Sequence, residues 1–445
     1  MRKMGMPVAL AELLLITAAP ALGEVGDWRP TEQHVILFQG AIPGDLAQSV
    51  SASGGELVRQ HPEVGVAITD GLTDESAAAG AGNARVARDV SVRAVPDLDQ
   101  MAWSIETLPD AGATPLAHDP ASAVLFAAQW NMRIIEADAA WDAGFEGTPE
   151  VNVAIIDSGI DPFHFDLAGL VDPLASIAFV PSLTGPPAWV DDNFHGTHVA
   201  GIVATNGIGT SGVAPHTTLV AIKACDALGD CPVAAIISGI LYATSIGVDV
   251  INLSLGTAFP KNAPGGATLL AAFNKAVNHA NRHGVLVVSG AGNDTADLQH
   301  NGNAVVTPCE SGAGICVSAT GPDDLLASYS NYGTSAIDVA APGGDLIDTG
   351  DPVTAMVLAP CTTRSALPPL AGCAGNLMYL FVEGTSQAAP HVSGAAALLA
   401  AQSSRPRSAA HLKSALQRSA DDLGEAGRDP AYGAGRLNVC HLVGC

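Results

Sequence analysis

From about residue 150 onward, short continuous apolar runs alternate with longer amphipathic or Ala-rich stretches. Strands buried on both faces, separated by helices, are typical of a parallel sheet covered by helices on both sides. The sequence therefore predicts a three-layer α/β/α fold with a mostly parallel sheet. The expected strands are Val151–Ile156, Leu219–Ile222, Val248–Leu253, Val285–Val288, Cys316–Ala319 and Ile337–Ala340, and the expected helices lie at about 195–204, 233–246, 267–282, 387–402 and 409–419.

The N-terminus has the features of an export signal. Arg2 and Lys3 precede an apolar stretch, Leu13 to Leu22, which ends in small residues. We interpret residues 1–23 as a signal peptide, which predicts a secreted protein, extracellular or periplasmic. A retained membrane anchor is the alternative, but the run is shorter than the roughly 20 residues that span a bilayer. No later segment looks transmembrane, so we expect no stable membrane association.

Residues 30–95 have the pattern of a small α+β unit. Strands and helices are expected in the order β-α-β-β-α-β, which is the ferredoxin-like arrangement. Residues 96–125 contain Pro, Asp, Gly and Ala without periodicity, so we interpret them as a linker. Residues 126–445 then form the α/β domain.

The charge balance and the cysteine content limit which partners and which kinds of site are expected. The chain has 44 acidic and 19 basic residues, a formal net charge of −25, which argues against nucleic acid or an anionic membrane as the partner. The eight cysteines form four sequence-local couples without CxxC spacing, which favours disulfides over a zinc site. Local pairing is one of 105 connectivities, and unpaired buried thiols are a further alternative. The local scheme predicts Cys225–Cys231, Cys309–Cys316, Cys361–Cys373 and Cys440–Cys445.

Three segments carry candidate catalytic residues. Asp157 follows the first expected strand, His195 opens a helix of small residues, and Ser386 stands where a loop enters an Ala-rich helix. Each has an ordinary structural interpretation: a turn or cap Asp, a structural His and an N-cap Ser. Polar groups beyond the carboxyl ends of parallel strands are nevertheless where sites form in such sheets.

Together, the segments resemble the three signature blocks of the subtilisin family (subtilases), in the order Asp, His, Ser. The resemblance runs from about Gln129 to the C-terminus. It implies that Ser386 is the nucleophile, that His195 is the general base and then acid, and that Asp157 orients the imidazole. His198 is left as a structural residue. Asn293 matches the side chain that completes the family's oxyanion hole.

The resemblance also suggests how substrate binds. It implies a secreted serine endopeptidase that acts on proteins or peptides as a monomer, through an acyl-enzyme and without a cofactor for the chemistry. The expected walls of the cleft carry no charge, so we expect broad specificity with an apolar P1 residue. These walls are Ser254, Leu255 and Gly256 on one side and Gly290, Ala291 and Gly292 on the other.

Further expectations follow from the same resemblance. Residues 30–95 resemble an inhibitor I9-like propeptide that inhibits its own enzyme, with cleavage between about Val95 and Ala128. Asp166 resembles a ligand of a structural calcium site, although the companion loop, Thr205 to Ser211, is about two residues short. The Thr307–Pro308 bond is expected to be cis. The alternatives are a specialised processing protease, a peptide ligase, or a catalytically silent binding protein on the same fold.

Overall fold

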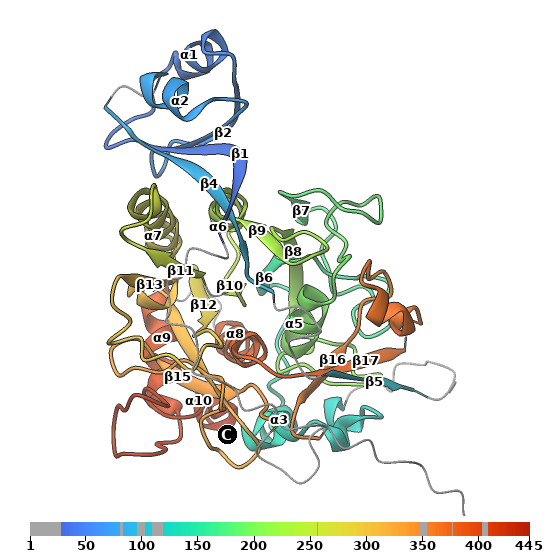
Figure 1. The fold of residues 1–445 in the computed structure, drawn as a ribbon. Helices are drawn as coiled ribbons and strands as arrows, with labels where there is room; N and C mark the ends of the chain where they lie inside the picture. The colour runs from blue at the N-terminus through green and yellow to red at the C-terminus, as the bar shows by residue number, and fades with distance from the viewer. Residues whose placement is uncertain are drawn as a thin grey trace, which may run out of the picture.

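A computed structural model describes residues 28–80, 83–95, 103–108, 119–255, 257–346, 354–375, 377–402 and 408–445. Its centre is a seven-stranded sheet in the order β15-β14-β12-β10-β6-β8-β7 (Figure 1). Every neighbouring pair in this sheet is parallel, which confirms the predicted fold class. The strands are β6 (Asn152–Asp157), β7 (Ile177–Ala178), β8 (Thr218–Lys223), β10 (Val250–Leu253), β12 (Leu286–Gly290), β14 (Ile315–Thr320) and β15 (Val339–Pro342).

Helices cover both faces of this sheet. Successive side chains of each strand point to opposite faces, so each face contributes to its own apolar core. In β6, Val153 and Ile155 belong to one apolar cluster, while Ala154 and Ile156 belong to the other. The second cluster contains side chains of two helices, α6 (Val233–Ser245) and α7 (Gly266–Arg282). The first cluster contains side chains of six helices: α3 (Trp130–Ile134), α4 (Ala137–Asp142), α5 (His195–Val203), α8 (Thr385–Ala401), α9 (Ala409–Ser419) and α10 (Val439–Val443).

Residues 28–95 form the N-terminal unit, which has the predicted element order. Its antiparallel strands lie in the order β2-β3-β1-β4, and β4 also pairs with β9 (Asp230–Pro232) of the α/β domain. In Figure 1 the unit stands above α6 and α7. Its elements are β1 (Trp28–Leu37), α1 (Leu46–Ala52), β2 (Glu56–His61), β3 (Val66–Asp70), α2 (Asp74–Gly80) and β4 (Arg85–Arg93).

The two faces of the N-terminal sheet are buried against different partners. Ile36 and Phe38 pack with residues of α1 and α2 within the unit. Val35 and Leu37, which alternate with them, belong to the same cluster as α6 and α7. The sheet thus completes its second face with the α/β domain.

Part of the predicted linker, residues 96–125, forms a strand. Residues Trp103–Thr107 form β5, which pairs antiparallel with β17 (Met378–Val382), itself paired with β16 (Val357–Pro360). The partner strand lies some 275 residues away in sequence, so local periodicity gives no sign of this pairing. Residues 96–102 and 109–118, and the predicted signal peptide, lie outside the described residues.

Covalent features agree with the predictions. The four local disulfides Cys225–Cys231, Cys309–Cys316, Cys361–Cys373 and Cys440–Cys445 are all present. The Thr307–Pro308 peptide is cis, at the end of β13 (Ala304–Thr307), which pairs with β11 (Thr257–Pro260). Within the described ranges, no helix is long and apolar enough to cross a membrane.

Candidate active site

Asp157 and His195 form a buried pair at the carboxyl end of β6. His195 Nδ1 lies 2.8 and 2.9 Å from the two carboxylate oxygens of Asp157. The Asp157 side chain is fully buried, and Oδ1 also accepts the backbone N–H of Ser158 at 2.7 Å. A proton held on Nδ1 leaves Nε2 as the acceptor nitrogen of a neutral ring. That Nε2 is buried and has no hydrogen-bond partner among the described residues.

Gly196 allows α5, which begins at His195, to pack closely against the residues that follow β6. A Cβ on Gly196 would lie 2.1 Å from the Gly159 carbonyl oxygen, so no larger residue fits after the histidine. The Gly196 N–H donates to the Ser158 Oγ at 2.9 Å. The first turn of α5 is therefore fixed to the residues that follow β6.

Ser386 lies in the first turn of α8, which packs against α5. Its Oγ–H donates to the carbonyl oxygen of Ser254 at 3.0 Å, and the Ser254 Oγ–H donates back to the Ser386 carbonyl oxygen at 2.8 Å. The hydroxyl proton of Ser386 is thus held by a backbone carbonyl in this structure.

Asn293 is exposed, but its amide has a fixed orientation. Its Oδ1 accepts the backbone N–H of Thr385 at 2.9 Å and the hydroxyl of Thr385 at 2.8 Å. Because the oxygen is held by two donors, the Nδ2 group faces the other way, where it is available to donate. This amide and the N–H of Ser386 are thus held near each other at the start of α8.

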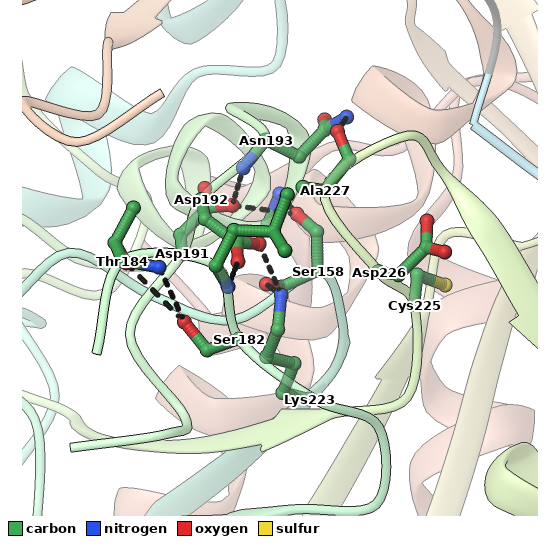
Figure 2. A network of polar contacts seen from close by, with 12 residues as sticks. Ser158, Ser182, Thr184, Asp191, Asp192, Asn193, Lys223, Cys225, Asp226 and Ala227 are labelled. Carbon is green, nitrogen blue, oxygen red and sulfur yellow. Dashed lines mark hydrogen bonds and ion pairs between the residues drawn. The ribbon is translucent and has the colours of Figure 1, made fainter. Parts of the chain in front are cut away.

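A network of buried polar side chains around Asp191 and Asp192 was not predicted from the sequence (Figure 2). The fully buried Asp191 carboxylate accepts the Ser158 hydroxyl at 2.9 Å and both the N–H and the hydroxyl of Thr197, at 3.0 and 2.6 Å. Burial raises the pKa of Asp191 to about 6, although Lys223 and the hydrogen bonds oppose that rise. Asp191 therefore ties the first turn of α5 to the end of β6.

The adjacent Asp192 forms a fully buried ion pair with Lys223. Lys223 Nζ lies 2.5 Å from Asp192 Oδ1 and donates to the Ser158 carbonyl oxygen at 2.6 Å. Such a pair is costly to break, because one partner alone leaves an uncompensated buried charge. Sequence signals existed: Asp191 and Asp192 directly precede the His195 segment, and Lys223 ends an apolar run.

Two further buried histidines have their pKa values lowered by burial. The pKa of His198 falls to about 3 and that of His391 to about 4. His198 Nε2 lies 2.8 Å from the Leu380 carbonyl oxygen, and His391 Nε2 lies 2.9 Å from Asn131 Nδ2. Both rings are neutral at pH 7 and serve as hydrogen-bonding core residues.

The candidate substrate walls are only partly described. Ser254 and Leu255 are buried after β10, while Gly256 lies outside the described residues. On the other wall, the N–H of Gly292 donates to the Thr385 hydroxyl at 3.1 Å, and a Cβ on Gly290 would lie 2.8 Å from the Thr385 carbonyl oxygen. Ala291 is also buried there.

The calcium prediction for Asp166 does not fit the structure. Its carboxylate accepts the backbone N–H groups of Ile208, Gly209 and Thr210 at 2.7 to 3.0 Å and the hydroxyl of Tyr379 at 2.9 Å. Carboxylate oxygens whose lone pairs accept hydrogen bonds from several N–H and O–H groups are not free to coordinate Ca²⁺. The short loop at 205–211 closes directly onto the carboxylate, and the described residues contain no group of three His, Cys, Asp or Glu side chains placed to hold a metal.

The α/β domain is similar in sequence to known proteins. A family model described as the subtilase family matches residues 148–435. Subtilisin Savinase of Lederbergia lenta is 34% identical over 312 residues, which cover 70% of this chain and 96% of that relative. The minor extracellular protease Epr of Bacillus subtilis is 33% identical over 311 residues, which cover 69% of this chain but only 41% of Epr.

The fold of this chain is also similar to those of solved protease structures. A lanthipeptide protease is 30% identical with a TM-score of 0.62, over 71% of this chain and 93% of that one. The epidermin leader peptide processing serine protease of Staphylococcus aureus has a TM-score of 0.71 at 22% identity, over 94% of this chain and 98% of its own. The second likeness concerns the fold alone, and it covers more of the chain than residues 148–435.

Proposed function

The chain belongs to the subtilase family, and from that premise we propose that it is a secreted serine endopeptidase whose triad is Asp157, His195 and Ser386. The observation that carries the proposal is the Asp157–His195 pair, which holds the Nδ1 side of the ring and leaves the buried Nε2 without a partner among the described residues. With Nδ1 held in this way, Nε2 can accept a proton from a neighbouring hydroxyl group. Ser386 supplies that donor from the neighbouring helix.

The chemistry follows from these groups. Ser386 Oγ attacks the carbonyl carbon of the peptide bond while its proton passes to His195 Nε2, and the carboxylate of Asp157 stabilises the charged ring. The oxygen of the tetrahedral intermediate receives hydrogen bonds from Asn293 Nδ2 and the Ser386 N–H, and the N-terminus of α8 favours its negative charge. His195 then gives its proton to the leaving amine. Water repeats the sequence on the acyl-enzyme and releases Ser386.

Residues 1–23 and the N-terminal unit complete the proposal. We assign the first as a signal peptide and the second as a propeptide that is cleaved from residues 126–445. The docking of β4 on β9 supports this role, because it brings the end of the unit to the loop beside His195. The relative Epr is named an extracellular protease, which supports export of this chain as well.

The test compares the purified wild-type protein with Ser386→Ala. We expect casein hydrolysis to fall by about 10⁶-fold, which is the loss known for subtilisin, itself a member of this family, when its nucleophile is removed. Labelling by a serine-directed covalent inhibitor should disappear, and the N-terminal unit should remain attached. Ser245→Ala, which changes an exposed serine at the end of α6, is the matched control and should behave as wild type. Near-normal hydrolysis by Ser386→Ala would end the proposal.

A second candidate is a specialised processing protease. The observation that favours it is the likeness to a lanthipeptide protease at 30% identity. A processing enzyme should cleave a defined precursor peptide at one bond and leave unfolded casein almost intact. A broad endopeptidase should degrade both.

A further inference from the structure

Strand β9 presents a rigid edge to the last strand of the N-terminal unit. Strand β4 pairs with it antiparallel, and Val92 lies opposite Cys231 and Arg93 opposite Asp230. The edge belongs to a short loop that the Cys225–Cys231 disulfide closes. Within the loop, Asp226 Oδ1 accepts the N–H groups of Leu228 and Asp230, at 2.9 and 3.0 Å.

Asp230 binds two arginines through this edge. Arg93 donates Nε to Oδ1 at 2.9 Å and Nη2 to Oδ2 at 3.3 Å, which is a bidentate arrangement. Arg29 donates Nη1 to Oδ2 at 2.7 Å. Both guanidinium groups come from the N-terminal unit, and Asp230 is only 15% exposed between them. When that unit leaves, Asp230 loses both of these cations.

The same loop is joined to the candidate catalytic histidine. Asn193 Oδ1 accepts the N–H of His195 at 3.1 Å. Asn193 Nδ2 donates to the carbonyl oxygen of Ala227 at 3.0 Å, and both residues are labelled in Figure 2. On the chain that occupies the edge, the N–H of Val95 donates to the Gly229 carbonyl oxygen at 3.5 Å. The β9 edge therefore leads a bound strand toward His195.

Further along the chain, a second segment is also held by strand pairing. The next described segment is β5, and Trp103 lies opposite Val382, four residues before Ser386. Two described segments that follow one another along the chain, the end of β4 and β5, are thus both anchored on the α/β domain by strand pairing. Edge strands recognise extended peptides by backbone hydrogen bonds, while side chains set the specificity.

We propose that Asp230 is a specificity-determining residue: the β9 edge, once freed of β4, selects substrate segments with an arginine or lysine at the position that Arg93 occupies. This proposal rests on the proposed function, since it needs a peptidase from which the N-terminal unit has departed. The recognised partner is a peptide in extended conformation with a basic side chain on the N-terminal side of the scissile bond. The carboxylate pairs with that cation across the two strands.

The test is a cleavage profile on a mixed peptide library, with the mature enzyme and its Asp230→Asn, Asp230→Glu and Asp230→Arg variants. For the wild type, we expect one position N-terminal to the cut to favour Arg or Lys over Ala by about tenfold in kcat/KM, as a charge-assisted pair predicts. Asp230→Glu should keep that preference, Asp230→Asn should lose it, and Asp230→Arg should favour Asp or Glu there. The circular dichroism spectrum and the urea midpoint of Asp230→Asn should match those of the wild type, which reports that the variant is folded.

Glu150→Gln is the matched control, because it removes one negative charge from an exposed residue before β6, at the opposite end of the strand from Asp157. It should keep the wild-type profile. A wild-type profile without basic preference at any position before the cut overturns the proposal, as does a preference that survives in Asp230→Asn. A wild-type enzyme that cleaves no peptide at all instead removes the proposed function, and the proposal with it.

Discussion

The N-terminal unit and the α/β domain bury their sheets in different ways. The seven-stranded sheet of the domain is enclosed on both faces by helices of the same domain. The four strands of the N-terminal unit are covered on one face by α1 and α2, and on the other by α6 and α7 of the domain. All four disulfides lie in the domain. The comparison indicates a self-sufficient domain and a unit whose fold depends on docking.

The largest expected effect tests that dependence in the full-length Ser386→Ala protein, which under the proposed function keeps its N-terminal unit attached. Val35 is fully buried in the apolar cluster shared with α6 and α7, so Val35→Asp places an unpaired charge in the interface. We expect the N-terminal unit to lose about 4 kcal/mol or more of stability, while the domain unfolds at the wild-type urea concentration. Hydrogen exchange resolved by residue measures both.

The control for this substitution is Val58→Asp, which changes a valine of β2 that is 37% exposed. Its effect should stay below about 1 kcal/mol, because the new charge remains in water. If Val35→Asp lowered the stability of both regions equally, the two would form one cooperative core and the comparison would fail.

The second effect should fall on the domain alone. Removing the disulfide with Cys309→Ala and Cys316→Ala releases a short closed loop, which costs about 2.5 kcal/mol on the chain-entropy account. Urea unfolding of the same precursor should show the domain transition move and the N-terminal transition stay in place. A shift of the N-terminal transition by a similar amount would mean that the unit draws its stability from the domain as a whole rather than from the face of α6 and α7.

The comparison also explains what the sequence can predict. The strands of the parallel sheet are continuous apolar runs, and Asp157, His195 and Ser386 lie in segments with family-specific patterns, so both follow from local sequence. The strand β5 and the pair of Arg93 with Asp230 depend on partners far away in the chain, and no periodicity reports them. The calcium expectation at Asp166 finds no support for a related reason, since only the folded loop shows its N–H groups turned toward Asp166.

The buried network around Asp191 was missed for a different reason. Two adjacent aspartates before a helix usually indicate a solvated turn, and acidic residues are rarely fully buried. Here Asp192 is paired with Lys223, and Asp191 is surrounded by hydroxyl and N–H donors, so burial is tolerated. Such compensation is a property of the assembled site, and the separate segments do not display it.

The smallest effect concerns the pH dependence of docking. Asp89 of β4 is fully buried at the interface, where its Oδ1 accepts the N–H of Ala234 in the first turn of α6 at 2.9 Å. Burial raises the pKa of Asp89 to about 7, against an ordinary value of about 3.9 when the side chain is in water. The docked state therefore binds the proton more readily. The contribution of Asp89 protonation to the free energy of docking is complete below about pH 4 and is lost as the pH rises through about 7.

We accordingly expect docking of the N-terminal unit to weaken by about 1.4 kcal/mol for each pH unit between about 4 and 7, so that the unit opens more readily at neutral than at acidic pH. Asp89→Asn keeps the acceptor oxygen for Ala234 and removes the titration, so the slope should flatten. Asp45→Asn, at an exposed position of the same unit, should retain it. The measurement is the opening free energy of β4 amides in the Ser386→Ala precursor, from hydrogen exchange corrected for intrinsic rates. A slope that persists unchanged in Asp89→Asn would assign the pH dependence to another group and leave Asp89 as a simple helix cap.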